Sequence, residues 1–511
     1  MTDSHRSPNI VLMITDQQRT DTLAAYGNDW IDSPHLNALA AESFLFENAY
    51  CTQAVCTPAR GTLMTGLYPH SHGCTVNYAA GYDALAEIYR HPQDRLDTLV
   101  GLRDDTPTLA ELLPADYRTA NMGRWHLGND TFIQHGFAEW ISTEDSCRPW
   151  YHRPDPPFSD YHHWLLEHGY TPDLTLPNGD QIFSVNQRAT FPPEHQMGAF
   201  LADHSVRFIR ENAGRPWCLV YSGFEPHPPF TGPYNGKYDP AGLPVGPAFM
   251  RYPAGHSLFN RARADFFKGT TAGYGKAAQD GIVTEDLATE TGWRRQRANY
   301  YGNVKIVDDA VGRLVAALEE TGQVEDTIFV FTSDHGEMLG DHGFWEKRAF
   351  YEESFRIPLF IRIPWLKRAG QRVAGNISHV DLMPTLLDLA GAPVPTQLEG
   401  RSVADILRNG EDRCDRSAVL EWSGYGERDL GSRTANLMAS LPRRAIVSAD
   451  RWKLNLCVGD QGELFDLNED PHELNNRFDD PACRDRIRTM YAELRLWQRR
   501  TRDPEPLPPI S

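Results

Sequence analysis

The sequence contains no apolar run long enough to cross a bilayer. Its N-terminal stretch is polar, and the apolar run at 10–14 is only five residues long, too short for a membrane span or a leader peptide. The eight cysteines are scattered over 511 residues without a C-x-x-C pair. That spacing argues against a disulfide framework and against a cysteine-based zinc site. These absences lead us to expect a cytoplasmic protein that does not associate with membranes.

Positive charge is also scarce. The chain has 50 Lys and Arg against 69 Asp and Glu, a net charge of −19. Nucleic acid or an anionic membrane surface is therefore not expected as the main partner. A small anionic substrate remains compatible with this total, because a binding site responds to its local charges.

The length exceeds that of one ordinary hydrophobic core, so we expect a large domain and a smaller one. Residues 1–405 alternate apolar strands with amphipathic helices, a pattern typical of an α/β doubly wound sheet. The strands are expected at 9–14, 117–122, 217–221, 327–332 and 357–361. The helices are expected from 33–34 onward (with Leu36, Leu39, Ala40 and Phe44 on one face), over 304–318 and over 381–389.

Two irregular inserts interrupt this pattern, at about 140–200 and 231–290. The first is too long for a simple connection, and we expect it to form a wall or lid of the site. From 406 to 511 the pattern changes to short strands at 444–447 and 452–456 and a helix at 485–499. We interpret this part as a small C-terminal α+β domain.

The segment Cys56-Thr57-Pro58-Ala59-Arg60-Gly61 combines a thiol, a proline and an arginine within six residues. If Pro58 lies in a first helical turn, Cys56 lies at the helix N-terminus, where negative charge is favoured. Arg60 then lies about one turn away on the same face. Taken alone, the pattern is more typical of a buried cysteine in an ordinary helix.

Polar side chains follow four of the predicted strands. Because ligands bind beyond the carboxyl ends of strands in open α/β sheets, these side chains are expected to converge. Two carboxylates, an amide and an imidazole suit a divalent cation, and three cationic side chains suit a tetrahedral oxyanion. The cation candidates are Asp16, Gln17, Asp334 and His335; the oxyanion candidates are Arg60, Arg124 and Lys347; the candidates for proton transfer are His126 and His227. Together they suit displacement at sulfur or phosphorus.

Three stretches resemble motifs of one enzyme family. The segment 56–61 resembles the signature by which type I sulfatases are marked for conversion of a cysteine to formylglycine. The segment 123–128, Gly-Arg-Trp-His-Leu-Gly, resembles their second signature, and 463–467, Glu-Leu-Phe-Asp-Leu, with Asp470-Pro471 and Glu473, resembles their C-terminal motif. The resemblance extends from Asp16 to about Asn475. It implies the alkaline-phosphatase-like fold, a mixed sheet flanked by helices, with a small C-terminal sheet domain.

The resemblance also implies a role for each matched residue. Cys56 would become formylglycine through a formylglycine-generating enzyme, and its hydrate, activated by the cation and Arg60, would attack the ester sulfur. His227 and Lys347 would stabilise or protonate the departing alcohol oxygen, and His126 would take the proton that lets sulfate leave. Substrate would be bound by Arg124, Lys347 and Asn77. One divalent cation would be held by Asp16, Gln17, Asp334, His335 and the formylglycine at position 56.

This chain departs from the commonest sulfatase pattern in three places. Familiar arylsulfatases carry Asp-Asp and Asp-Asn at the two metal-binding strand ends, whereas this chain has Asp16-Gln17 and Asp334-His335. That combination is more similar to the phosphonate monoester hydrolase and choline sulfatase branch. The imidazole makes manganese a competitor of calcium, the family default. Arg124 stands where lysine is usual, while His126 is kept, unlike in the phosphonate hydrolases.

We interpret the chain as a sulfuric ester hydrolase that acts on a small anionic ester. The closest alternative is a phosphonate monoester or phosphodiester hydrolase with the same residues. A second alternative is a non-catalytic sulfatase-like binding protein, which predicts an unmodified Cys56 or no bound metal. The irregular loops are compatible with a homo-oligomer. His70, His72 and His342 are interpreted as loop or packing residues.

Overall fold

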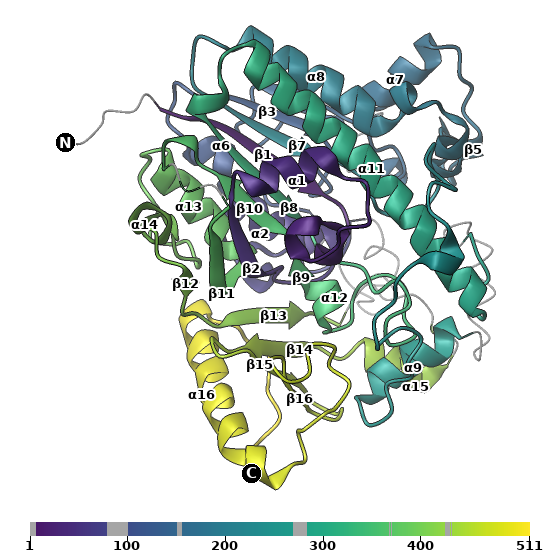
Figure 1. Cartoon of the computed structure of the whole chain (residues 1–511), viewed down its shortest axis with the longest axis vertical. Coiled ribbons are helices and arrows are strands. Elements are labelled where there is room, and N and C mark those ends of the chain that lie inside the picture. Colours follow the sequence, from purple (N-terminus) through teal and green to yellow (C-terminus); the bar gives the residue numbers. More distant parts are fainter. Residues whose placement is uncertain are drawn as a thin grey trace.

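The computed structural model describes most of the chain. The described residues are 7–78, 101–150, 156–268, 284–366, 368, 370–424, 430 and 432–510. Residues 151–155 of the first predicted insert and residues 269–283 of the second lie outside the described residues. Two sheets lie one after the other along the long axis of the molecule. The larger sheet lies in the half that contains the N-terminus (Figure 1).

The larger sheet has ten strands in the order β12-β11-β2-β10-β8-β1-β7-β3-β4, with β9 paired to β2. The central strands β8, β1, β7 and β3 are parallel, and β10 is antiparallel to both of its neighbours, so the sheet is mixed. The strands are β1 (Asn9–Thr15), β2 (Phe44–Tyr50), β3 (Arg118–Gly123), β4 (Glu139–Ile141), β7 (Trp217–Ser222), β8 (Thr327–Ser333), β9 (Arg356–Ile357), β10 (Leu359–Arg362), β11 (Arg372–Ser378) and β12 (Arg413–Cys414).

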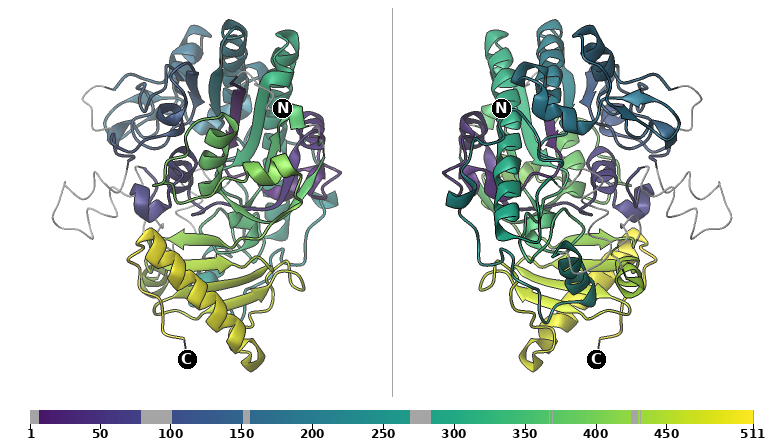
Figure 2. Two further views of the ribbon diagram at one scale, coloured as in Figure 1. Left: turned by 90° about the vertical axis from the view of Figure 1, so that its left-hand side faces the viewer. Right: turned by 90° about the vertical axis from the view of Figure 1, so that its right-hand side faces the viewer.

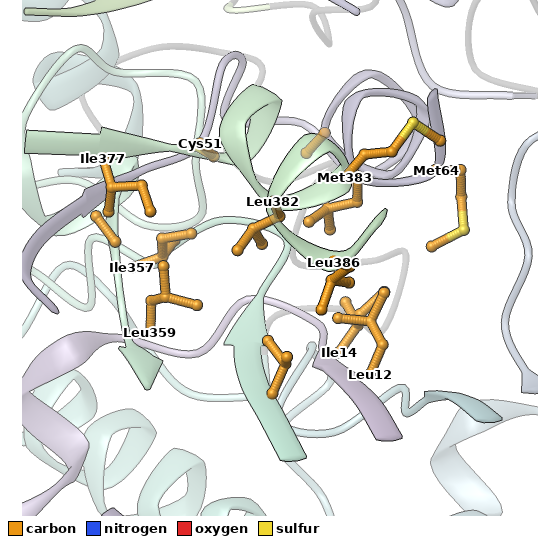
Figure 3. Close-up of a cluster of buried hydrophobic side chains, with 14 of the residues drawn as sticks. Leu12, Ile14, Cys51, Met64, Ile357, Leu359, Ile377, Leu382, Met383 and Leu386 are labelled. Atoms are coloured by element: carbon orange, nitrogen blue, oxygen red, sulfur yellow. The ribbon is translucent and has the colours of Figure 1, made fainter. Parts of the chain in front are cut away.

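Helices cover both faces of this sheet, and the side chains of β1 alternate between the two layers. Leu12 and Ile14 belong to the same buried cluster as Met383 and Leu386 of α13 (Figure 3). The opposite face of β1 packs in a second cluster with helices α1, α8 and α11. The helices of the large unit are α1 (Pro34–Ala41), α2 (Cys56–Thr65), α3 (Pro69–His72), α6 (Leu109–Leu112), α7 (Asp160–Glu167), α8 (Met197–Glu211), α9 (Leu258–Phe267), α11 (Glu290–Glu320), α12 (Glu352–Phe355), α13 (Leu382–Leu389) and α14 (Ala404–Asn409).

The doubly wound α/β architecture is confirmed, and two local predictions are wrong. Phe44 does not belong to the face of α1, because that helix ends at Ala41 and Phe44 begins β2. The single strand predicted at 357–361 is divided into β9 and β10 by Pro358, which has no N–H to donate to a neighbouring strand. The insert at 140–200 is partly regular: besides α7 it contains the short hairpin of β5 (Leu174–Thr175) and β6 (Gln181–Ile182).

The second sheet is an antiparallel four-stranded meander in the order β13-β14-β15-β16. Its strands are β13 (Ala418–Trp422), β14 (Arg443–Val447), β15 (Trp452–Cys457) and β16 (Glu463–Asp466), followed by α16 (Arg484–Thr501); α15 (Arg433–Ala439) lies between β13 and β14. Figure 2 shows α16 crossing the sheet, where Leu494 and Trp497 pack against Leu454 and Leu464. The domain boundary at 405/406 stays a prediction.

A buried ionic cluster joins the two sheets. Lys453 Nζ of β15 lies 2.9 Å from Glu473 Oε1 and 3.3 Å from Glu352 Oε1. Glu473 also accepts the main-chain N–H of Glu352, at 2.7 Å, and so satisfies a donor at the start of α12. The carbonyl oxygen of Ser354, on α12, accepts the N–H of Gly336 at 2.8 Å. Through α12, the C-terminal segment therefore supports the loop that follows β8.

All eight cysteines fall within the described residues, and all are buried and free. Among the described helices, none combines the length and the apolarity that a bilayer span requires.

A partly buried histidine makes the contact between α3 and the C-terminal unit sensitive to pH. His70 Nδ1 lies 2.7 Å from Glu421 Oε1 of β13, and its Nε2 lies 3.1 Å from the carbonyl oxygen of Thr501. Burial disfavours the charged imidazole, but the charge and hydrogen bond of Glu421 outweigh it and raise the pKa of His70 to about 9. His70 is therefore a cation in the folded protein at neutral pH.

We predict that His70→Gln destabilises the protein only below about pH 9. Because the folded pKa lies above the unfolded value of about 6.5, the contribution of His70 is complete below pH 6.5 and is lost as pH rises through 9. The variant should lose up to about 3 kcal/mol of unfolding free energy at pH 6 and almost none at pH 9.5. Urea unfolding at both pH values measures this, and an equal loss at both would contradict the assignment.

Candidate active site

The register of the central strands brings the predicted strand-end residues together. In the parallel pair β1 and β8, Thr15 lies opposite Ser333, so Asp16 and Asp334 leave the sheet side by side. On the other side of β1, β7 ends at Ser222, opposite Gly123 of β3. One edge of the sheet thus carries Asp16, Gln17, Ser222, Arg124, Asp334 and His335.

Helix α2 directs its first residue into this edge. Cys56 is the first helical residue and fully buried, as expected from Pro58 in the first turn. Cys56 Sγ lies 3.2 Å from His335 Nε2 and 3.6 Å from Asp16 Oδ1. The next N–H of the helix, that of Thr57, donates to Asn77 Oδ1 at 3.2 Å, which places Asn77 beside the start of α2.

Arg60 is the central cation of the site. Its Nε donates to Asp334 Oδ2 at 3.0 Å and its Nη2 to Asp16 Oδ2 at 2.9 Å. Its Nη1 donates to Ser222 Oγ at 2.5 Å and to the carbonyl oxygen of Arg124 at 3.1 Å. A planar guanidinium can bridge these groups because its donors diverge in fixed directions, which the point charge of a lysine cannot reproduce.

Cys56 and three side chains around it form a cluster that suits a divalent cation. Ligand atoms of Asp16, Cys56, Asp334 and His335 all lie within 4.8 Å of one another, and all four residues are buried. The Nδ1–H of His335 donates to the carbonyl oxygen of Gly336 at 2.9 Å, so its Nε2 lone pair faces the cluster. Two carboxylates with a neutral imidazole fit calcium or manganese.

Charge also favours a cation in this position. Burial opposes the ionisation of Asp16, yet Arg124 and Arg60 hold the pKa of that carboxyl well below its usual range. Burial, reinforced by the negative charge of Asp16, raises the pKa of Asp334. Burial and Asp16 also raise the pKa of Cys56 to about 12. The unmodified side chain is therefore a protonated thiol at neutral pH and a poor nucleophile.

Gln17 is fixed at both its main chain and its side chain. Its N–H donates to Asp334 Oδ1 at 3.0 Å, and its carbonyl oxygen accepts from Tyr300 Oη at 2.8 Å. These bonds hold Gln17 at φ 69°, a left-handed conformation uncommon for glutamine. The side-chain oxygen accepts from Lys347 Nζ at 2.6 Å, and the side-chain nitrogen donates to Glu337 Oε2.

Lys347 and His227 are hydrogen-bonded to each other. Lys347 Nζ lies 3.1 Å from His227 Nε2, while the Nδ1–H of His227 donates to the carbonyl oxygen of Pro228 at 2.6 Å. Burial and the neighbouring charge of Lys347 hold the pKa of His227 well below its usual range. His227 is therefore neutral, with its Nε2 as an acceptor and Lys347 as the donor.

Arg124 and His126 lie on the opposite side of Asp16. Arg124 Nη1 donates to Asp16 Oδ2 at 2.7 Å, and its Nη2 lies 3.4 Å from His126 Nε2. Burial and the charges of Arg124 and Arg60 hold the pKa of His126 well below its usual range, so this imidazole is neutral and able to accept a proton. Arg124 Nε lies 3.5 Å from Glu144 Oε2, a contact with the predicted insert at 140–200.

Each predicted site residue except Asn77 contacts the side chain of at least one other predicted site residue. Asn77 instead contacts the main chain of Thr57, next to Cys56. Their chemical roles stay predictions. Sequence reasoning missed Ser222, Glu337 and Glu144, which act on other side chains. A signal was available for two of them, since Ser222 ends a predicted strand and Glu337 lies two residues beyond His335.

The chain matches the models of two protein families. A model described as Sulfatase matches residues 8–392. The chain belongs to the sulfatase family. A second model, N-sulphoglucosamine sulphohydrolase, C-terminal, matches residues 340–500 of this sulfatase-family chain. The family and its sulfatase-named relatives support a sulfuric ester hydrolase, and the predicted family is confirmed.

Individual relatives span nearly the whole sulfatase-family chain. A multifunctional alkaline phosphatase superfamily protein of Trinickia caryophylli is 28% identical over 96% of this chain and 95% of its own length. An N-acetylglucosamine-6-O-sulfatase of Bacteroides thetaiotaomicron is 26% identical over 98% of this chain and 88% of its own. Among solved structures, the phosphonate monoester hydrolase of Agrobacterium radiobacter superposes with a TM-score of 0.72 at 26% identity, covering 97% of this chain and 96% of the other.

We predict that Arg60→Met destabilises the protein strongly. The substitution leaves Asp16 and Asp334 buried and facing each other without their shared cation, and unpairing a buried charge costs about 3–5 kcal/mol. Urea unfolding without added metal measures the loss. Arg103→Met, which removes an exposed pair with Asp105, is the control and should leave stability nearly unchanged, because solvent screens an exposed ion pair. Equal stability of the two variants would contradict this account of Arg60.

Proposed function

We propose that this protein hydrolyses sulfate monoesters to sulfate and an alcohol or phenol, through a formylglycine derived from Cys56 and one divalent cation. The observation that carries the proposal is the geometry around Cys56. Its Sγ lies against His335 and Asp16 at the N-terminus of α2, with Arg60 bridging the two carboxylates behind it. The family match supplies the reaction class.

Two groups complete the proposed chemistry. Formylglycine, as its hydrate, supplies an oxygen nucleophile and a route to release sulfate by carbon–oxygen cleavage. A divalent cation, calcium or else manganese, would act as a Lewis acid that activates the nucleophile and offsets the charge of the sulfate. Asp16, Asp334, His335 and the side chain at 56 would hold it, and Gln17 would present its amide oxygen.

The remaining residues divide into two groups on either side of Asp16. Arg124 and Lys347 would bind the non-bridging sulfate oxygens, with Asn77 at the start of α2. His227 Nε2 accepts a hydrogen bond from Lys347 and therefore has no proton to give. Lys347 Nζ would donate the proton to the departing alcohol oxygen. His227 would hold that ammonium in place. His126 Nε2 would accept a proton from the formylglycine hydroxyl group.

A second candidate function has support of its own. Asp16-Gln17 and Asp334-His335 resemble the branch that contains phosphonate monoester hydrolases and choline sulfatases, and one phosphonate monoester hydrolase shares the fold over nearly the whole chain. Phosphonate and sulfate monoesters present similar tetrahedral groups to Arg124 and Lys347, while Arg60 is held by Asp16, Asp334 and Ser222. For either activity, we propose that the protein is cytoplasmic, is matured by a formylglycine-generating enzyme and assembles into a homo-oligomer.

Mass spectrometry tests the proposed modification directly. The tryptic peptide 20–60 contains Cys51 and Cys56 and ends at Arg60. In protein from its native host, the aldehyde should be found at Cys56 only, so Cys51 serves as an internal control. Detection of cysteine alone at position 56 would defeat the proposed nucleophile and favour the non-catalytic alternative.

Turnover separates the two candidate activities. We expect kcat/KM for an aryl sulfate to exceed that for the matching aryl phosphonate monoester by at least about tenfold, or about 1.4 kcal/mol of transition-state stabilisation. The two substrates should carry the same leaving phenol, so that the comparison isolates sulfur from phosphorus. A preference for the phosphonate would reverse the assignment.

A further inference from the structure

Glu337 lies just behind the proposed cation site and contacts its neighbours through both carboxylate oxygens. Oε1 accepts the main-chain N–H of Leu339 at 3.0 Å and that of Glu346 at 2.7 Å. Oε2 accepts from the side-chain nitrogen of Gln17. Glu337 is fully buried, and its own N–H donates to the carbonyl oxygen of Glu353 at 2.9 Å, so both its main chain and its side chain are fixed.

These contacts determine which way the amide of Gln17 faces. A carboxylate only accepts hydrogen bonds and an ammonium only donates them. With Glu337 on one side and Lys347 on the other, the Gln17 nitrogen must face Glu337 and the Gln17 oxygen must face Lys347. An amide oxygen binds a divalent cation, whereas an amide nitrogen repels it.

The same carboxylate also shapes the segment that delivers Lys347. By accepting the N–H groups of Leu339 and Glu346, Glu337 draws together the two ends of a loop in which Leu339 and Glu346 both have positive φ, 43° and 66°. Lys347 follows Glu346 directly, and its own carbonyl oxygen accepts from Arg263 Nη2 at 3.0 Å. Glu337 therefore contacts the Gln17 side of the site and the Lys347 side at once.

We propose that Glu337 is a positioning residue that orients the Gln17 amide oxygen toward the cation and holds Lys347 beside it. The inference rests on the proposed function for the presence of a cation. Glu337 touches neither substrate nor cation, so its effect reaches the chemistry only through Gln17 and Lys347.

Glu337→Gln tests the orientation with little change of shape. The new amide oxygen can still accept from Leu339 and Glu346, but its nitrogen then meets the nitrogen of Gln17. Gln17 can relieve this donor–donor contact by rotating its amide, which turns the nitrogen toward Lys347 and the cation. We expect roughly a 10–100-fold loss of Mn²⁺ and Ca²⁺ affinity, measured by calorimetric titration of metal-stripped protein.

Glu353→Gln is the matched control. Glu353 is a partly buried residue on α12 whose main-chain carbonyl oxygen accepts from Glu337, and its buried Oε2 has no hydrogen-bond partner among the described residues. Its replacement should leave cation affinity within about threefold of the wild type, and it controls for the exchange of a carboxyl group for an amide close to Glu337. Thermal unfolding of both variants without metal checks that each is folded.

The double variant Gln17→Glu/Glu337→Gln exchanges the two groups and supplies the decisive comparison. Glu337→Gln can then donate to the new carboxylate at 17, and an oxygen again faces Lys347, so most of the lost affinity should return. Wild-type affinity in Glu337→Gln, an equal loss in Glu353→Gln, or no recovery in the double variant would overturn the inference. Failure of the wild-type protein to bind either cation would instead defeat the cation of the proposed function, and the inference with it.

Discussion

The bridge that Arg60 makes between Asp16 and Asp334 is the interaction on which the site depends. Two carboxylates that follow adjacent parallel strands converge in a buried space, where like charges repel strongly. Arg60 offsets that repulsion by binding the Oδ2 atom of each carboxylate, which leaves Oδ1 of Asp16 facing Cys56 Sγ. Because one guanidinium also binds Ser222 and the carbonyl oxygen of Arg124, it joins four strand ends into one rigid group.

The strands that carry the site could be predicted because both of their faces are buried. β1 and β8 are continuous apolar runs, and the residues after such runs must reach the same edge of a parallel sheet. β2 was missed because Phe44 continues the apolar spacing of α1, although that helix ends at Ala41. Most of the insert at 140–200 gave no periodic signal, because its elements are short.

The same reasoning explains which site residues the sequence could identify. Asp16, Asp334 and His335 are the side chains that would hold the proposed cation, so their types and positions were informative. Glu337 and Ser222 act by orienting another side chain, and nothing in a linear pattern indicates which partner they contact. The tautomers of His227 and His335 are likewise set by main-chain carbonyl groups, those of Pro228 and Gly336, which only the folded backbone brings into reach.

The complete burial of Cys56 has a consequence for the timing of its chemistry. The proposed formylglycine requires an enzyme to reach this side chain, yet the folded molecule exposes none of it. Glu473, which supports α12 and through it the loop after β8, is synthesised long after Cys56. Under the proposed function, the modification would therefore take place before Glu473 and the elements that it supports complete the fold.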